Sequence, residues 1–318
     1  MKGIKWSAVY GAALALFTLF LALQTFVLPS GQRQDAGKID TSIFDTPVPE
    51  KTDPAPQTDP APQTDPVLPE EPRPDYPIVT DTSYEDEHFK IVITTEVYED
   101  TTVYTADITM DSAVYLKTAM AYDTFGRNIK ATTSANAKDH NAILAINGDY
   151  YGARESGIVI RNGVLYRSKA DTSDLLCIYA DGSFKIYKAG ERTAEELMEE
   201  KVWQCFAFGP GLVSGGEVTV SDGQEVRHAM ASNPRTAIGI VDDLHYLFVV
   251  SDGRTAKSAG LSLEQLAAYM KEKGCRTAYN LDGGGSSTMW FNGSLVNMPT
   301  STGRTVSERS ISDIVYIG

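Results

Sequence analysis

The sequence predicts a mixed α+β domain. It is expected to contain a largely antiparallel sheet, a few packed helices and one strand-helix-strand crossover, preceded by a transmembrane helix and a disordered stalk. Three observations predict this. Short stretches of alternating apolar residues recur from Phe89 onward, as is typical of strands. Two capping boxes mark helix starts. The first quarter of the chain has neither feature, because an uncharged apolar run is followed there by a Pro-rich repeat.

Residues 1–28 are predicted to be a short cytoplasmic tip and a transmembrane signal anchor. The run from Ser7 to Leu28 carries no charge and is long enough to cross a hydrocarbon core of about 30 Å as a helix. Lys2 and Lys5 precede it, and Lys residues are retained on the cytoplasmic side. The sequence therefore predicts a single-pass protein of the cell membrane, with its domain outside. A cleaved signal peptide is the alternative, but this run exceeds the usual length of its apolar region.

Residues 29–76 are predicted to be a Pro-rich linker of low complexity. The hexad Thr-Asp-Pro-Ala-Pro-Gln occupies 52–57 and repeats at 58–63. Pro blocks helix and sheet ladders and favours the extended polyproline II conformation. The segment is therefore expected to hold the domain away from the membrane as a semi-rigid spacer.

Residues 77–318 have the composition of a folded domain. Asp-Gly between two apolar runs favours a tight hairpin turn, and Ser or Thr three residues before Glu or Gln caps a helix. The predicted elements are strands over Phe89–Val97 and Thr101–Met110, hairpins over Leu175–Lys188 and Ala237–Ser251, and helices that start at Thr193 and Ser262.

A strand-helix-strand crossover is expected over Leu247–Ser251, Ser262–Lys273 and Thr277–Leu281. Each of its strands ends in Asp-Gly. Because parallel strands direct their carboxyl ends to one sheet edge, Asp252 and Asp282 are predicted to lie side by side, about 5 Å apart per strand step.

Three glycines, Gly283 to Gly285, follow Asp282, and Ser286, Ser287 and Thr288 come next. A glycine run has a high entropic cost in folding, which a close approach of the backbone to a ligand would offset. Stacked amide groups and hydroxyls here would suit an anion such as phosphate. A tight structural turn is the alternative, and the Lys of a P-loop is absent.

The stretch Asn280–Met289 resembles the signature of the phosphodiester glycosidase family. Further matching blocks follow the family's order: Ile146–Tyr151, Pro234–Gly239 and Val250–Arg254, with weaker matches at Phe208–Val213 and Ser307–Arg309. The resemblance covers nearly all of the chain from about residue 90 onward. Two residues depart from it, because Asp149 stands where many relatives have Gly, and Glu308 is typical of bacterial members only.

The resemblance implies an extracytoplasmic hydrolase that cleaves the bond between a sugar's anomeric carbon and a phosphodiester, in an envelope glycan or a sugar-phosphate conjugate. The catalytic candidates are the carboxylates of Asp252, Asp282 and Glu308, acting as nucleophile or base around an oxocarbenium-like transition state. A separation of about 5 Å would favour retention, and about 6.5 to 9.5 Å would favour inversion. Arg235 and Arg309 are expected to stabilise the departing phosphate.

Substrate-binding residues are expected in the same motifs. Asn147 and Asp149 offer polar groups to sugar hydroxyls, and Tyr150 offers an aromatic face to the ring. An Asx turn beside core tyrosines is the alternative for this motif. The full predicted set is Asn147, Asp149, Tyr150, Arg235, Asn280, Gly283, Gly284, Gly285, Ser286, Ser287, Thr288 and Arg309.

Composition excludes other partners and leaves some alternatives open. A net charge of −14 argues against nucleic acid, whose phosphates are bound by Lys and Arg. Cys177, Cys205 and Cys275 lack metal-like spacing, and the sequence requires no cofactor. Clustered Asp residues would equally suit a divalent cation such as Ca²⁺. The alternative function is a non-catalytic module that binds an envelope glycopolymer through the same loop and arginines.

Overall fold

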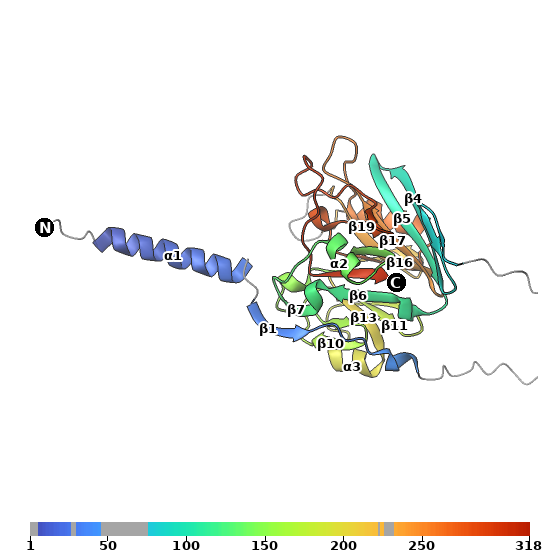
Figure 1. Ribbon diagram of the computed structural model, residues 1–318, viewed down its shortest axis with the longest axis horizontal. Helices are drawn as coiled ribbons and strands as arrows, with labels where there is room; N and C mark the ends of the chain where they lie inside the picture. Colours follow the sequence, from blue (N-terminus) through green and yellow to red (C-terminus); the bar gives the residue numbers. More distant parts are fainter. Residues whose placement is uncertain (1–5, 27–29, 46–75, 222, 226–231) are drawn as a thin grey trace, which may run out of the picture.

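The computed structural model describes residues 6–26, 30–45, 76–221, 223–225 and 232–318 (Figure 1). Its strands form three large sheets and one two-stranded sheet, and every pair between them is antiparallel. The helices within the domain are short. The predicted α+β class with largely antiparallel strands is confirmed.

The largest sheet has nine strands. In spatial order they are β15 (Glu217–Val218), β14 (Gly211–Ser214), β18 (Thr277–Asn280), β16 (Thr236–Asp242), β17 (His245–Ser251), β5 (Thr101–Met110), β4 (Phe89–Tyr98), β3 (Ser83–Glu85) and β2 (Ile78–Val79). Helix α4 (Leu263–Glu272) packs on one face of this sheet. The other face contributes to the main core.

Two five-stranded sheets complete that core. One contains β10 (Val164–Arg167), β9 (Val159–Arg161), β13 (Val202–Ala207), β11 (Leu175–Tyr179) and β12 (Phe184–Tyr187). The other contains β20 (Ser294–Leu295), β19 (Met289–Phe291), β8 (Leu144–Asn147), β21 (Asp313–Ile317) and β6 (Leu116–Met120). Helix α3 (Ala194–Glu199) packs on the first sheet, and α2 (Thr133–Asp139) packs on the second. The single turns of 3₁₀ helix are η1 (Thr41–Phe44), η2 (Ala113–Tyr115), η3 (Ala121–Asp123), η4 (Tyr151–Ala153) and η5 (Gly284–Ser286).

Strand β17 illustrates how the sequence builds this core. Phe248 and Val250 enter the main core between the sheets, whereas Leu247 and Val249 point to the other face and pack beneath α4. Successive side chains of a strand face opposite sides, so a strand covered on both sides is apolar throughout. Each large apolar side chain that is fully buried contributes about 1.5–3 kcal/mol.

The predicted hairpins and helix starts are confirmed. β11 pairs with β12, and β16 pairs with β17. The capping boxes at Thr193 with Glu196 and at Ser262 with Gln265 are both formed. Gly274 follows α4 with a φ of +86°, which ends the helix as expected.

The predicted crossover is only half right. β17 and β18 run in the same direction and α4 connects them, but they are not neighbours. β16 lies between them and pairs antiparallel with both. The prediction that Asp252 and Asp282 lie side by side is therefore wrong, because the strand that precedes the crossover occupies the position between them.

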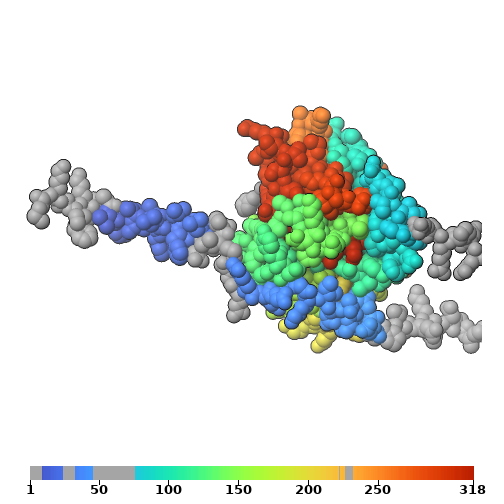
Figure 2. Space-filling view, in the orientation of Figure 1, coloured from blue at the N-terminus to red at the C-terminus, as the bar shows by residue number. Residues whose placement is uncertain are grey.

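The predicted linker is wrong for its first part. Residues 30–45 contain β1 (Ser30–Asp35), which pairs with β7 (Thr124–Arg127), and then η1. Figure 2 shows this segment, in blue, lying against the domain. Phe44 packs edge-on against the buried ring of Trp203, with 5.0 Å between the ring centroids. Strand pairing needs only backbone groups, so the polar sequence 30–35 can form a strand. It lacks the alternating apolar residues from which a strand is predicted. The Pro repeats, 52–63, lie outside the described residues.

Helix α1 (Trp6–Phe26) occupies most of the predicted membrane span (Figure 1). Of the helices that the structure describes, none combines the length and the apolar character needed to cross a bilayer.

Candidate active site

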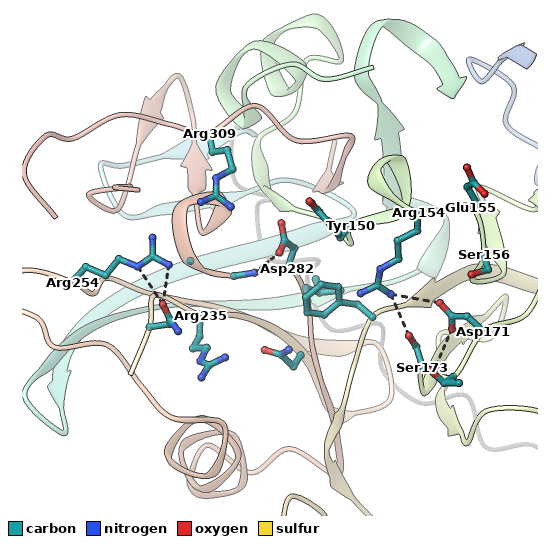
Figure 3. Close-up of a pocket in the computed structure, with 17 residues that line it drawn as sticks. Tyr150, Arg154, Glu155, Ser156, Asp171, Ser173, Arg235, Arg254, Asp282 and Arg309 are labelled. Carbon is teal, nitrogen blue, oxygen red and sulfur yellow. Dashed lines mark hydrogen bonds and ion pairs between the residues drawn. The ribbon is translucent and has the colours of Figure 1, made fainter. Parts of the chain in front are cut away.

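One edge of the nine-stranded sheet gathers charged residues from three neighbouring strands. Arg235 immediately precedes β16, Asp282 follows β18 and Arg254 follows β17. Since β16 runs antiparallel to both neighbours, its start and their ends meet at the same edge. A cavity of about 830 Å³ opens there (Figure 3). Its lining residues are Tyr150, Arg154, Glu155, Ser156, Asp171, Thr172, Ser173, Phe208, Asn233, Arg235, Arg254, Asn280, Leu281, Asp282, Gly283, Gly284 and Arg309.

The backbone holds Asp282 in place from two sides. The amide side chain of Asn147 donates to the Asp282 carbonyl over 2.6 Å, and the Asp282 N–H donates to the Gly148 carbonyl over 3.3 Å. The Gly283 N–H donates to the carboxylate itself over 3.0 Å. Burial raises the pKa of Asp282 above its ordinary value, and the Ser286 hydroxyl and the positive charge of Arg309 oppose this rise. The result is a carboxylate oriented by fixed donors.

Two guanidinium groups lie over the glycine turn after Asp282. A Cβ on Gly284, whose φ is +63°, would be 2.8 Å from Nη2 of Arg254, and a Cβ on Gly285 would be 2.6 Å from Nη2 of Arg309. A side chain at either position would displace these guanidinium groups, and the φ of Gly284 also favours glycine. Figure 3 shows Arg254 and Arg309 on one side of Asp282.

The charges of these two arginines are not balanced by ion pairs. Arg254 donates to the neutral Oδ1 of Asn233, over 3.2 Å from Nε and 2.9 Å from Nη2, and to the Ser301 carbonyl over 2.7 Å. Among the described residues, no carboxylate forms an ion pair with Arg254 or Arg309. Burial and then the nearby charge of Arg309 lower the pKa of Arg254. Two like charges in a cavity favour an anionic ligand.

Arg235 differs because it has a carboxylate partner. It is 3% exposed, its Nη2 pairs with Glu225 over 2.5 Å, and its Nε donates to the Leu261 carbonyl over 2.8 Å. Burial lowers its pKa, and Glu225 opposes that change. Arg235 lines the cavity as predicted, but with its charge already compensated.

The opposite side of the cavity is partly aromatic. Arg154 lies over the ring of Phe208 at 5.2 Å and over that of Tyr150 at 6.0 Å. It also pairs with Asp171 over 3.7 Å and donates to Ser173 over 3.2 Å. Tyr150 is 43% exposed, so its ring is accessible to a ligand. Rings beside hydrogen-bonding groups suit the apolar face and the hydroxyls of a sugar.

The structure brings together about half of the predicted site residues. Those that line the cavity are Tyr150, Arg235, Asn280, Asp282, Gly283, Gly284 and Arg309. Those that do not line it are Asn147, Asp149, Gly285, Ser286, Ser287, Thr288, Asp252 and Glu308. Gly285 and the three hydroxyl residues form the buried base of the turn, where they shape the cavity from behind.

Asp252 anchors a loop. Its Oδ1 accepts the Met298 N–H over 2.9 Å and the Asn297 amide over 3.3 Å, and its Oδ2 accepts the Tyr104 hydroxyl over 3.1 Å. Both oxygens are occupied and the residue is 6% exposed. The predicted catalytic role is therefore not matched by its position, since the crossover places β16 between it and Asp282.

Glu308 does not line the cavity. Its carboxylate accepts the Ser134 N–H over 2.9 Å and also the Ser134 hydroxyl, at the first turn of α2. Orphan N–H groups at a helix start attract a carboxylate. Glu308 therefore lies at the start of α2 and not among the residues that line the cavity, so its position does not support the predicted catalytic role.

Asn147 and Asp149 also turn out to be supporting residues. Asn147 accepts from Thr236 and Thr288 and holds the Asp282 backbone. Asp149 is buried against Arg161 over 3.1 Å. The sequence places Asn147 and Asp149 at the end of a predicted strand. It does not show in which direction their side chains point.

The sequence reading missed Arg154, Arg254 and Phe208. Arg254 ends a block that carries the resemblance, directly after Asp252-Gly253, so a signal existed for it. Phe208 likewise opens a weaker block. Arg154 follows η4 and carries no motif of its own.

No group of three or more His, Cys, Asp or Glu side chains with the arrangement of a metal site occurs within the described part of the chain. The three cysteines are free and buried.

The chain is similar to known proteins in sequence and in fold. The family model for phosphodiester glycosidases matches residues 140–318. The SPbeta prophage-derived uncharacterized protein YomE of Bacillus subtilis (strain 168) is 29% identical over 179 residues, which are 54% of this chain and 28% of that protein. The human N-acetylglucosamine-1-phosphodiester alpha-N-acetylglucosaminidase is 25% identical over 190 residues, which are 54% of this chain and 36% of that protein. The chain thus spans about a third of the length of these curated relatives.

Solved structures show the same fold. The catalytic domain of zebrafish N-acetylglucosamine-1-phosphodiester alpha-N-acetylglucosaminidase superposes with a TM-score of 0.57 at 21% identity, over 72% of this chain and 82% of that one. A hypothetical protein from Synechocystis gives 0.50 at 14% identity, over 73% and 62%. With more than half of its residues matched by the family model, the chain belongs to the phosphodiester glycosidase family.

Proposed function

We propose that this domain hydrolyses the bond between the anomeric carbon of a sugar and a phosphodiester. One observation carries the proposal: Arg254 and Arg309 lie beside the carboxylate of Asp282 in an open cavity, and neither is ion-paired among the described residues. Two cations next to one carboxylate suit a substrate whose anionic group departs from an electron-poor carbon.

The chemistry fits a cavity with a single carboxylate near the two arginines. In the reaction the C1–O bond breaks, the phosphodiester leaves as a phosphomonoester anion, and a water oxygen bonds to C1 with loss of a proton. A phosphate leaving group is weakly basic, so guanidinium groups can stabilise it without a general acid. Asp282 either attacks the anomeric carbon itself or deprotonates the water molecule that attacks this carbon. Asp252 and Glu308 do not line the cavity, and the two other lining carboxylates, Asp171 and Glu155, are ion-paired with Arg154 and Arg127.

The aromatic side of the cavity is assigned to the sugar. Tyr150 and Phe208 offer ring faces, while Arg154, Asp171 and Ser173 offer hydrogen-bonding groups. The human and zebrafish relatives are named for N-acetylglucosamine-1-phosphodiesters, which supports a sugar of this class.

The substrate is proposed to be an envelope glycan or a sugar-phosphate conjugate met outside the cytoplasm. This rests on sequence alone, through the uncharged run from Ser7 to Leu28 and the preceding Lys2 and Lys5. Anchoring at a membrane by this segment is part of the same proposal.

The direct test replaces Asp282 by Asn. Turnover of an N-acetylglucosamine-1-phosphodiester by the full chain is expected to fall about a thousandfold in kcat, since a positioned acid or base contributes about 10²–10⁴-fold. Circular dichroism establishes that the variant is folded.

The matched control is Asp252→Asn, because Asp252 stands in the twin Asp-Gly motif but outside the cavity. Its Oδ1 would still accept two N–H groups and its amide could donate to Tyr104, so turnover should stay within about threefold of the wild type. Equal losses in both variants would refute the assignment. Saturable binding of the phosphodiester with no product from the wild-type chain would favour the glycopolymer-binding module.

A further inference from the structure

Three charged side chains form a buried cluster behind the cavity. Arg161, Asp149 and Asp313 are only 2%, 3% and 0% exposed. The Arg161 guanidinium donates to Oδ2 of Asp313 from Nε over 2.9 Å and from Nη2 over 2.8 Å, and Nη2 lies 3.1 Å from Oδ1 of Asp149. One cation thus pairs with two carboxyl groups, and the positive charge of Arg167 also acts on Asp149 without forming an ion pair with it. If both were ionised, the buried cluster would carry a net negative charge, which is costly away from water.

The two carboxyl groups differ in their donors. Asp149 accepts the Tyr151 N–H on Oδ1 and the Ala207 N–H on Oδ2, each over 3.0 Å, in addition to Arg161. Asp313 receives both of its hydrogen bonds on Oδ2, and its Oδ1 has no partner. An ionised oxygen without a donor is unfavourable in a dry interior. Each oxygen of Asp149 has a donor, so the geometry favours Asp313, rather than Asp149, as the carboxyl that carries the proton.

The unpartnered oxygen lies against the residue that connects the cluster to Asp282. A Cβ on Gly148 would be 2.4 Å from Oδ1 of Asp313, so only glycine fits there. The Gly148 N–H donates to the Asp313 carbonyl over 2.8 Å, and the Gly148 carbonyl accepts the Asp282 N–H over 3.3 Å. One peptide residue therefore separates the buried carboxyl from the carboxylate at the cavity.

We propose that Asp313 holds a proton at neutral pH and is a positioning residue for Asp282, leaving Asp282 as the ionised carboxylate at this site. The inference rests on the proposed hydrolytic role of Asp282. It adds a residue that lies outside the cavity and acts through its protonation state.

The surrounding charges agree with this assignment. Burial raises the pKa of Asp313 to about 8; Arg161 opposes this rise, and the charges of Asp149 and Asp282 add to it. Tyr151 also faces the cluster, and burial raises its pKa well above the ordinary value, so it stays neutral. On the cavity side, Asp282 faces the cations Arg309 and Arg154.

Deprotonation of Asp313 at alkaline pH has two consequences. It adds a negative charge close to Asp282, which repels that carboxylate from its position. It also weakens the attraction of the cavity for an anionic phosphodiester. We therefore expect kcat/KM to fall as pH rises through the titration of Asp313.

The protonation state is measured without reference to activity. In the full chain labelled with aspartate that is ¹³C-enriched at its carboxyl carbon, NMR should show a carboxyl that is still protonated at about pH 7, far above the ordinary Asp pKa of about 3.9. The resonance should be missing in Asp313→Asn and present in Asp282→Asn. Absence of any such resonance from the wild type would overturn the proposal.

The kinetic test compares two neutralising variants. Asn at 313 copies the protonated carboxyl, so Asp313→Asn should move the alkaline limb of kcat/KM upward by at least about one pH unit. Asp149→Asn removes the charge that keeps Asp313 protonated, so the same limb should move to lower pH. An alkaline limb that stays unchanged in a folded Asp313→Asn chain would refute the proposal. If no chain hydrolyses the substrate, the proposed function fails, while the NMR result still decides the state of Asp313.

Discussion

In the proposed function, recognition of the phosphate depends on Arg254 and Arg309. They approach the backbone at Gly284 and Gly285, positions where any side chain would displace them. Arg254 donates to amide and carbonyl oxygens, and among the described residues neither arginine forms an ion pair with a carboxylate. The two positive charges repel each other in the free protein. Binding of an anion between them would relieve that repulsion and so favour the complex.

Replacing either arginine by Gln should weaken hydrolysis of a sugar-1-phosphodiester. A hydrogen bond to a charged group contributes about 1.5–3 kcal/mol, which corresponds to a loss of about 10- to 150-fold in kcat/KM. Steady-state kinetics with the phosphodiester and with an aryl glycoside of the same sugar provide the measurement. Arg192→Gln is the control, because Arg192 does not line the cavity. If both substrates lost the same factor in Arg254→Gln and Arg309→Gln, phosphate recognition by this pair would be disproved.

At the level of single residues, Asp282 and the glycine run could be identified from the sequence. Their motif combines a strand end, an acidic residue and glycines that permit a ligand to approach the backbone closely. It could not separate Asp282 from Asp252, since both stand in strand-Asp-Gly contexts. Their difference depends on which side chains reach them: Asn297 and Tyr104 occupy the carboxylate of Asp252, and these residues are far away in the chain.

The strands show which elements can be predicted from local signals. The hairpin of β16 and β17 and the capping boxes of α3 and α4 depend on neighbours in sequence, and all were predicted correctly. The insertion of β16 between β17 and β18 is a choice of partner over long range, which turn residues and periodicity do not encode. The relative positions of the site carboxylates depend on that choice.

The segment 33–45 is an element that composition concealed. Its backbone pairs with the domain where the Ala36 N–H donates to the Asp123 carbonyl over 2.7 Å and the Asp40 N–H donates to the Asn162 carbonyl over 2.9 Å. Phe44 then covers Trp203. The segment thus packs on the domain and does not belong to a spacer.

Phe44→Ala in the full chain should lower the free energy of unfolding by about 1–3 kcal/mol, as expected for removing a partly buried aromatic side chain. Guanidinium denaturation followed by tryptophan fluorescence measures the change. Ile39→Ala, at a site 46% exposed on the same segment, should alter stability by less than about 1 kcal/mol. Identical denaturation midpoints for Phe44→Ala and the wild type would show that this segment does not stabilise the domain.

At the scale of the whole molecule, all three large sheets contribute residues to the cavity. Loops from the nine-stranded sheet bring Arg235, Arg254 and Asp282, and loops from the two smaller sheets bring Arg154, Phe208 and Arg309. Arg254 and Arg309 lie on one side of Asp282, and Tyr150 and Arg154 lie on the other (Figure 3). This division predicts which bond of the substrate is exposed to Asp282: the one between sugar and phosphate.

Hydrolysis of a sugar-1-phosphodiester by the full chain in H₂¹⁸O tests this assignment most directly. A glycosidase breaks the C1–O bond, so the phosphomonoester should keep its original oxygens and show no ¹⁸O-induced shift by ³¹P NMR. Incorporation of one ¹⁸O into the phosphomonoester would mean that water attacks phosphorus, and the account of Asp282 acting at the anomeric carbon would be contradicted.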